Sequence, residues 1–307
     1  MKNQLRSGCY PVMLTPFFED MTVDYEGLQN FTKWFAKQGC QGLFAVCGSS
    51  EMTALSLKER VKIARTVVDT VKGLDIDVVA SGHVSPVIEE QIEEIQAISE
   101  TGIDSFVLVT SRIAHPYQDD RIFLKNLEHI LSATEGITFG VYECPSPYNR
   151  QLTPEIVKYM AQTGRFTFSK DTSCSYAIRE KIKAASDTNF KFFNAYSPLC
   201  LDSMKAGGQG YCGIHANFYP DLFVKLWELF TAGNMEKAEE LQSFLTILGE
   251  ASMPYNVGTK YYLNTFEGVS MGDYSRNSNV RLSDLEKEKL RQYYWAISQV
   301  REKFASI

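Results

Sequence analysis

Lys170 directly follows an apolar run of β-strand composition, residues 166–169. At the carboxyl end of a strand in a parallel sheet or barrel, its amine would project into the mouth where ligands bind. Loss of water lowers the pKa of a lysine amine, and the neutral amine can attack a carbonyl carbon to form a Schiff base. A structural lysine that extends to solvent or pairs with Asp171 explains the same position. Position alone leaves both interpretations open.

Tyr142 ends the preceding apolar run, residues 137–142, so we expect its phenol beside Lys170. A tyrosine hydroxyl in that place can carry a proton to or from a reacting group. The alternative is a core aromatic residue whose hydroxyl has a structural hydrogen bond. Taken as a pair, the amine and the phenol predict chemistry on a carbonyl compound.

A turn of small residues, Gly48, Ser49 and Ser50, follows another apolar run at residues 43–46. Backbone N–H groups and hydroxyls at a strand-to-helix junction suit a carboxylate or a phosphate. Ordinary turn chemistry, with a serine capping the next helix, is the alternative. The glycine motifs that bind nucleotides are absent from the sequence.

Three charged residues at predicted strand ends are candidates for contacts with a second substrate: Arg112, Glu143 and Arg150. A solvated loop position is the alternative interpretation of these charges. The histidines show neither an i, i+4 pair nor a Glu-linked spacing, and they are His83, His115, His129 and His215. We therefore expect no metal, and the candidate residues imply no organic cofactor.

The elements that would position these residues follow a regular alternation. Short apolar runs, eight in all, alternate with segments of helical period, which predicts βα units around a parallel sheet. The runs are residues 8–14, 43–46, 77–80, 105–109, 137–142, 166–169, 190–193 and 210–213. Eight such units predict a TIM (β/α)8 barrel over residues 1–233. Residues 234–307 carry no strand signal and predict a C-terminal helical extension, with helices at 235–249, 254–265 and 283–306.

Length and composition agree with this architecture. The 307 residues are 44% hydrophobic and 22% charged, which is enough apolar material for a sizeable core. The net charge is −6 without a basic block, so we expect no nucleic-acid partner. No run approaches the roughly 20 apolar residues that span a bilayer, so we expect a soluble, cytoplasmic protein without membrane contact. The seven cysteines form no CxxC pair, and we expect them to be reduced.

The strand-end residues resemble those of the dihydrodipicolinate synthase and N-acetylneuraminate lyase family of class I aldolases. The resemblance runs from Gly8 to about Gly268 and is carried by residues 15–17, residues 48–51, Tyr142 in a Tyr-x-x-Pro motif, Lys170, and residues 210–217. It implies that Lys170 forms an imine with pyruvate or a related 2-oxo acid and that Tyr142 moves protons. It also implies that Ser49 lies in the carboxylate-binding turn, that the backbone carbonyl of Cys212 faces the lysine, and that the chain assembles as a homo-oligomer, a tetramer or a dimer.

Several positions depart from the family pattern. Gly48 stands where the family has the first hydroxyl residue of the turn, and Ser50 stands where it has glycine. Ile113 replaces a tyrosine that reaches a neighbouring subunit in dihydrodipicolinate synthases, and Pro147 replaces their substrate-binding arginine. We therefore expect an aldolase or lyase acting on a 2-oxo acid. Condensation of pyruvate with aspartate semialdehyde, and a non-catalytic barrel that binds a small acid, are the alternatives.

Overall fold

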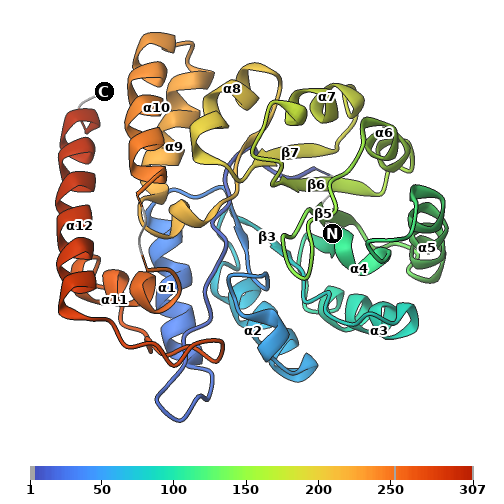
Figure 1. The fold of residues 1–307 in the computed structure, drawn as a ribbon, viewed down its shortest axis with the longest axis horizontal. Helices are drawn as coiled ribbons and strands as arrows, with labels where there is room; N and C mark the ends of the chain where they lie inside the picture. The colour runs from blue at the N-terminus through green and yellow to red at the C-terminus, as the bar shows by residue number, and fades with distance from the viewer. Residues whose placement is uncertain (1–3, 252–253, 306–307) are drawn as a thin grey trace.

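The computed structural model describes residues 4–251 and 254–305, and within these ranges the strands form one parallel barrel (Figure 1). The strands are β1 (Gly8–Cys9), β2 (Gly42–Phe44), β3 (Asp77–Ala80), β4 (Ser105–Val109), β5 (Phe139–Tyr142), β6 (Phe166–Asp171), β7 (Lys191–Asn194) and β8 (Gly210–Tyr211). Their order in the sheet is β1-β8-β7-β6-β5-β4-β3-β2. A parallel bridge between Val12 and Phe44 joins the first segment to β2 and closes the ring. The predicted TIM barrel is confirmed.

The helices surround the strands, and those after the barrel lie on one side of it (Figure 1). They are α1 (Tyr25–Lys37), α2 (Leu57–Thr70), α3 (Ile88–Ser99), α4 (Thr110–Ile113), α5 (Asp120–Ala133), α6 (Pro154–Gln162), α7 (Ala177–Ala184), α8 (Cys200–Lys205), α9 (Pro220–Thr231), α10 (Met235–Gly249), α11 (Val257–Phe266) and α12 (Asp284–Phe304). Short 3-10 helices lie at Met52–Ala54, Ser197–Leu199 and Ile214–Asn217. Helix α10 packs on α8 and α9, and α11 packs on α12. Ser306, at the end of the last predicted helix, lies outside the described residues.

Local sequence signals explain several of these boundaries. The Ser56 hydroxyl accepts a hydrogen bond from the Glu59 N–H, and the Glu59 carboxylate accepts one from the Ser56 N–H, which forms a capping box at the start of α2. Helix α7 does not follow β6 directly and begins only at Ala177. The Asp171 carboxylate accepts hydrogen bonds from the N–H and the hydroxyl of Ser173, so this segment forms a turn instead.

Strands β1 and β8 are shorter than the predicted runs, since residues 10–14 and 212–213 extend beyond the regular ladder. Gly210 has φ +141°, and a Cβ there would overlap the Gly8 carbonyl. Glycine is therefore required where β8 approaches β1.

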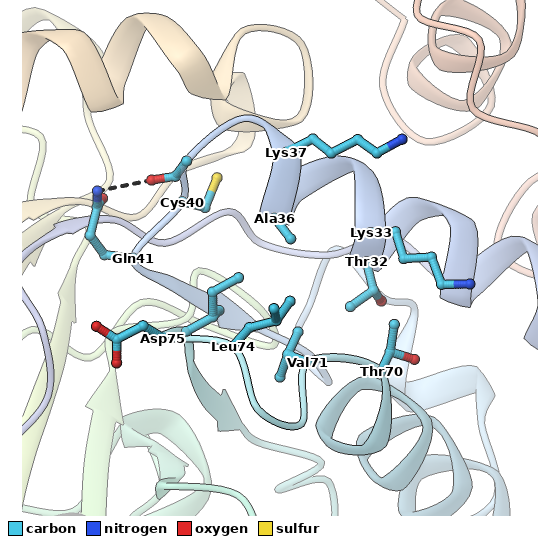
Figure 2. A pocket seen from close by; sticks show the side chains of 12 residues that line it. Thr32, Lys33, Ala36, Lys37, Cys40, Gln41, Thr70, Val71, Leu74 and Asp75 are labelled. Carbon is cyan, nitrogen blue, oxygen red and sulfur yellow. Dashed lines mark hydrogen bonds between the residues drawn. The ribbon is translucent and has the colours of Figure 1, made fainter.

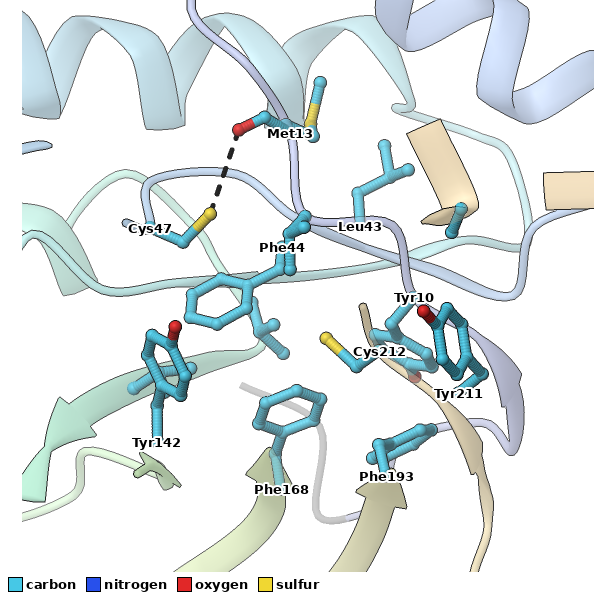
Figure 3. Close-up of a cluster of buried hydrophobic side chains, with 14 of the residues drawn as sticks. Tyr10, Met13, Leu43, Phe44, Cys47, Tyr142, Phe168, Phe193, Tyr211 and Cys212 are labelled. Atoms are coloured by element: carbon cyan, nitrogen blue, oxygen red, sulfur yellow. Dashed lines mark hydrogen bonds between the residues drawn. The ribbon is translucent and has the colours of Figure 1, made fainter. Parts of the chain in front are cut away.

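Aromatic side chains fill the barrel interior beneath the mouth (Figure 3). The ring centroids of Tyr10 and Phe193 lie 4.5 Å apart, and those of Phe168 and Phe193 lie 5.0 Å apart. Phe44 meets Phe168 and Tyr142 edge-on, at 5.8 and 6.0 Å. These contacts hold the ring of Tyr142 against a packed floor.

Along residues 4–251 and 254–305, none of the helices is long and apolar enough to cross a membrane.

Candidate active site

Lys170 and Tyr142 lie side by side at the carboxyl ends of neighbouring strands. The two residues are register partners between β5 and β6, and Lys170 is also the register partner of Phe193 on β7. The Lys170 side chain is buried, and its Nζ lies 4.2 Å from the centroid of the Tyr142 ring. The structure therefore places the amine over an aromatic face at the barrel mouth, as a cation–π contact requires.

The Lys170 amine has no carboxylate partner in the described part of the chain, and no hydrogen bond of its Nζ is seen there. Asp171, the partner that the structural interpretation requires, accepts a hydrogen bond from Lys181 Nζ at 2.7 Å instead. Buried lysines are normally paired, because an isolated ammonium loses its hydration without compensation. An unpaired buried amine at a strand end is typical of a functional group.

The Tyr142 hydroxyl faces space left open by a glycine. A Cβ on Gly48 would lie 3.8 Å from Tyr142 Oη and 3.9 Å from Cys144 Sγ, and both distances are ordinary contacts. Burial raises the pKa of Tyr142, and the neighbouring thiol of Cys144 raises it further. The phenol is therefore protonated at neutral pH and can donate a proton to a group bound beside Gly48.

The three residues of the turn after β2 differ in their exposure to solvent. Gly48 is exposed and Ser49 is half-buried, so both can reach a ligand. Ser50 is fully buried, and its hydroxyl lies 2.6 Å from the Met13 carbonyl oxygen and 2.7 Å from that of Ala45. It also accepts a hydrogen bond from the Cys47 N–H at 3.1 Å. The Ser50 side chain therefore fixes the turn from behind, and Gly48 and Ser49 form its ligand-facing side.

A segment just before α11 reaches the same turn. Tyr255 donates a hydrogen bond to Ser49 Oγ at 2.8 Å, and the side-chain amide of Asn217 donates one to Tyr255 Oη at 3.1 Å. The sequence prediction missed Tyr255, because rules about strand ends say nothing of a segment that returns to the mouth after the barrel is complete. No spacing or motif around Tyr255 signals this contact.

Glu51 connects the turn to the C-terminal helices. It has φ +59°, and its buried carboxylate lies 3.5 Å from Lys260 Nζ. It also accepts hydrogen bonds from the Ser275 hydroxyl at 2.9 Å and from the Asn277 N–H at 2.8 Å. Burial lowers the pKa of Lys260 to about 8, against the opposing effect of the Glu51 charge. The turn is thus braced by α11 and the loop that follows it.

Glu143 lies in a buried ionic cluster on the outer side of the strand ends. Its Oε1 lies 2.5 Å from Lys181 Nζ and accepts a hydrogen bond from the Leu152 N–H at 2.8 Å. Its Oε2 accepts one from the Thr172 N–H at 3.2 Å. Burial, with the nearby charge of Asp171, raises the pKa of Glu143 to about 7. All of these hydrogen-bond donors are groups of the protein. The Glu143 carboxylate therefore has a structural role beside the site.

The raised pKa of Glu143 predicts a pH dependence of stability. Between its ordinary pKa of 4.5 and about 7, folded Glu143 keeps a proton that the unfolded chain releases. Its contribution to the free energy of unfolding is therefore full below pH 4.5 and declines, by about 3 kcal/mol in all and by about 2 kcal/mol between pH 5 and pH 7.5, as the pH rises through 7. Urea unfolding of the wild type and Glu143→Gln at pH 5 and pH 7.5 measures this loss as the difference between the two proteins. This comparison cancels the opposing contributions of His83 and His215, whose pKa values burial lowers to about 4. A wild-type-minus-variant difference that rises or stays constant between the two pH values would contradict the prediction.

The two arginine candidates lie apart from Lys170. Arg150 binds the Asp120 carboxylate at 2.8 Å and the Gln118 carbonyl at 3.0 Å, so its side chain holds the loop before α5. Arg112 lines a separate cavity of about 310 Å³ together with Pro147 and Tyr148. Lys170 and Tyr142 are not among the residues that line this cavity. The structure therefore places Arg112 at a separate cavity and Arg150 in contact with Gln118 and the start of α5.

Two buried cysteines, Cys212 and Cys47, lie near Lys170 and Tyr142. Cys212 follows β8, is fully buried, and points its thiol into the interior that Tyr142 and Phe168 also face (Figure 3). Burial raises the pKa of Cys212 to about 12, and the Lys170 charge opposes this effect. Burial also raises the pKa of Cys47, where Lys170 again acts in the opposite sense. The Lys170 charge is therefore close enough to both thiols to act on their pKa values.

A larger cavity lies elsewhere on the molecule. It has a volume of about 700 Å³ and lies between α1 and the end of α2, with Ala36, Val71 and Leu74 in its lining (Figure 2). It contains none of the predicted site residues, so size alone does not indicate where the chemistry occurs. Across the described ranges, no group of three or more His, Cys, Asp or Glu side chains could hold a metal ion.

Comparison with known proteins gives consistent matches along the chain. Residues 6–297 match the model of the Dihydrodipicolinate synthetase family. The 4-hydroxy-tetrahydrodipicolinate synthase of Methanothrix thermoacetophila is 26% identical over 298 residues, which cover 95% of this chain and 97% of the relative. A dihydrodipicolinate synthase from Acinetobacter baumannii, solved with pyruvate, has a TM-score of 0.83 at 19% identity, covering 95% of this chain and 99% of that one. A sialic acid aldolase catalytic lysine mutant from Ruminococcus gnavus has a TM-score of 0.84 at 21% identity, covering 97% of each chain. At these identities the two structures show a shared fold.

Proposed function

The chain belongs to the dihydrodipicolinate synthetase family and is a class I aldolase-type enzyme of the lyase class, and we propose that it forms a Schiff base between Lys170 and the carbonyl carbon of pyruvate or a related 2-oxo acid. The observation that carries this proposal is the buried Lys170 amine, unpaired in the described part of the chain and 4.2 Å from the Tyr142 ring centroid. An amine without a carboxylate partner is available as a nucleophile.

In the proposed reaction, neutral Lys170 Nζ attacks C2 of the 2-oxo acid and forms a carbinolamine. Tyr142 Oη donates a proton to the departing hydroxyl group, which leaves as water and produces the iminium ion. The iminium draws electrons from C3, and the C3 proton passes to the Tyr142 phenolate left by the previous step, which gives an enamine and restores the phenol. The enamine carbon then bonds to the carbonyl carbon of an aldehyde, and the reverse sequence cleaves that bond.

The turn after β2 is the proposed carboxylate site. Gly48 and Ser49 lie on its accessible side, and the Ser49 hydroxyl and the backbone N–H groups supply the donors that a carboxylate accepts. Ser50 keeps the turn in shape through its own buried hydrogen bonds. Cys212 lies at the end of β8, where the family pattern has a backbone carbonyl that faces the lysine.

Two departures from the family pattern bear on the second substrate. Ile113 is buried, and its side chain therefore does not project toward another subunit as the family tyrosine does. Gly48 removes a hydroxyl from beside Tyr142 Oη. We propose an aldehyde other than aspartate semialdehyde, with Arg112 contacting it from the neighbouring cavity. Condensation with aspartate semialdehyde is the second candidate. The relative from Methanothrix thermoacetophila is named as a 4-hydroxy-tetrahydrodipicolinate synthase, and the match covers 97% of it.

The proposal also includes a homo-oligomeric assembly, either a tetramer or a dimer, and a cytoplasmic location. Membership of a family of typically soluble enzymes supports this part of the proposal. Sedimentation equilibrium measures the assembly directly.

Deuterium exchange into pyruvate tests the proposed chemistry without knowledge of the aldehyde. Enamine formation exchanges the C3 hydrogens of pyruvate with D2O, and proton NMR follows the loss of the methyl signal. We expect enzyme-dependent exchange with pyruvate or another 2-oxo acid. Binding without exchange for every 2-oxo acid would indicate a non-catalytic barrel, and rapid condensation with aspartate semialdehyde would support the second candidate.

Replacing Tyr142 by phenylalanine is expected to slow C3 exchange by about a hundredfold or more, because general acid–base groups contribute roughly 10²–10⁴-fold. The ring remains beneath Lys170, so pyruvate affinity should change little. NMR exchange rates measured at saturating pyruvate show the effect. Tyr159→Phe removes a hydroxyl that hydrogen bonds to Glu128 on the exterior and serves as the matched control. Equal rates for Tyr142→Phe and the control would exclude Tyr142 from proton transfer.

A further inference from the structure

A chain of three polar side chains ends at the proposed carboxylate site. Asn217 lies in the 3-10 helix after β8, Tyr255 lies just before α11, and Ser49 lies in the turn after β2. The Asn217 amide nitrogen lies 3.1 Å from Tyr255 Oη, which lies 2.8 Å from Ser49 Oγ. Tyr255 thus links the C-terminal segment to the Ser49 side of the turn.

The donor and acceptor of each hydrogen bond in this series are fixed by Asn217. Its side-chain nitrogen also lies 2.8 Å from the Val12 carbonyl oxygen, which can only accept a hydrogen bond. The amide nitrogen must therefore face both Val12 and Tyr255, since the opposite amide orientation would place two oxygens together. Tyr255 Oη consequently accepts from Asn217.

The same reasoning assigns the donor of the hydrogen bond between Tyr255 and Ser49. The single hydroxyl proton of Tyr255 is donated to Ser49 Oγ, because the nitrogen of Asn217 cannot accept it. Ser49 accepts this bond, and its own proton is left to point away from Tyr255. Burial raises the pKa of Tyr255, so the phenol keeps this proton at all ordinary pH values. The Ser49 proton is thereby left available for donation to another group, such as a ligand at the accessible side of the turn.

We infer that Tyr255 is a positioning residue that, through Ser49, prepares the turn for a ligand group that only accepts hydrogen bonds, namely the carboxylate of the 2-oxo acid. This inference rests on the proposed function and adds to it a residue from outside the barrel. A serine hydroxyl without this neighbour can rotate and present either its proton or a lone pair. Tyr255 occupies one of the two lone pairs and so reduces that freedom before the ligand arrives, which is a form of preorganisation.

The test is a double-mutant cycle on pyruvate binding, measured by calorimetry. Tyr255→Phe and Ser49→Ala are each expected to raise the Kd for pyruvate by about five- to tenfold, the effect of losing one oriented hydrogen bond to a charged group. Because Tyr255 acts through Ser49, the double variant should bind within about twofold of Ser49→Ala alone. Tyr261→Phe, on α11, is the control for loss of a tyrosine hydroxyl and should bind as the wild type does. Hydroxyacetone, which lacks the carboxylate, should be trapped on Lys170 by borohydride equally in the wild type and Tyr255→Phe.

Separate outcomes distinguish this inference from the proposed function. If Tyr255→Phe binds pyruvate with wild-type affinity, the proposed role of Tyr255 is overturned. The same holds if Tyr255→Phe raises the Kd by the same factor in the Ser49→Ala background as in the wild type. Pyruvate binding without any trapped adduct overturns the Schiff base, while the cycle still decides the role of Tyr255. Absence of pyruvate binding in the wild type overturns both.

Discussion

Replacing Lys170 by alanine is expected to abolish deuterium exchange into pyruvate, with a loss of at least about a thousandfold. The amine is the only group in the proposed reaction that becomes covalently bonded to the 2-oxo acid, and no other side chain can replace it within the mechanism. The exchange rate measured by proton NMR, at several pyruvate concentrations, gives the loss directly. Because the substitution removes a buried amine unpaired in the described part of the chain, the variant should remain folded.

Two further variants make this result specific. Lys170→Arg keeps a positive charge but cannot act as a nucleophile near neutral pH, so it should be as inactive as the alanine variant. Lys205→Ala alters an exposed lysine that pairs with Glu239, and it should exchange at the wild-type rate. Exchange by Lys170→Ala at a tenth of the wild-type rate would mean that the amine is not the nucleophile.

Replacing Lys181 by methionine is expected to lower the free energy of unfolding by about 3–5 kcal/mol. Its Nζ lies 2.5 Å from Glu143 Oε1 and 2.7 Å from Asp171 Oδ2, and all three side chains are buried. Without the ammonium, two carboxylates face each other in a dry environment, which is the costly way to break a buried ion pair. Urea unfolding at neutral pH measures the change.

The matched control removes an exposed ion pair of the same type. Lys205→Met breaks the pair with Glu239, which solvent surrounds, and should cost less than about 1 kcal/mol. Adding Glu143→Gln to Lys181→Met should recover part of the lost stability, because it neutralises one of the facing carboxylates. A cost below about 1 kcal/mol for Lys181→Met would show that the buried cluster does not stabilise the strand ends.

The barrel could be predicted because its signals are local. Apolar runs and the helical period between them depend on neighbours in sequence, and the rule that parallel strands share a carboxyl end then places Lys170 beside Tyr142. The lengths of the first and last strands were overestimated, since residues 10–14 and 212–213 lie beyond the regular ladder. The resemblance found at the strand ends is confirmed by the family match over residues 6–297.

The environment of the site could not be predicted in the same way, because the partners come from distant segments. Glu143 follows β5 at the mouth, yet Lys181 from α7 binds its carboxylate within the frame. Arg150 follows the same strand and binds the loop before α5. Tyr255 lies 206 residues from Ser49 in the sequence, yet the two side chains are hydrogen-bonded. Only packing determines such pairs.

Reduction of the protein with borohydride in the presence of pyruvate tests the central claim most directly. An imine on Lys170 is reduced to a stable secondary amine, so intact mass spectrometry should show one adduct per chain, and peptide mapping should place it on the segment that contains Lys170. The adduct should be absent from Lys170→Ala and from wild type reduced without pyruvate. Failure to trap an adduct with pyruvate and with other 2-oxo acids, or an adduct that persists in Lys170→Ala, would contradict the account.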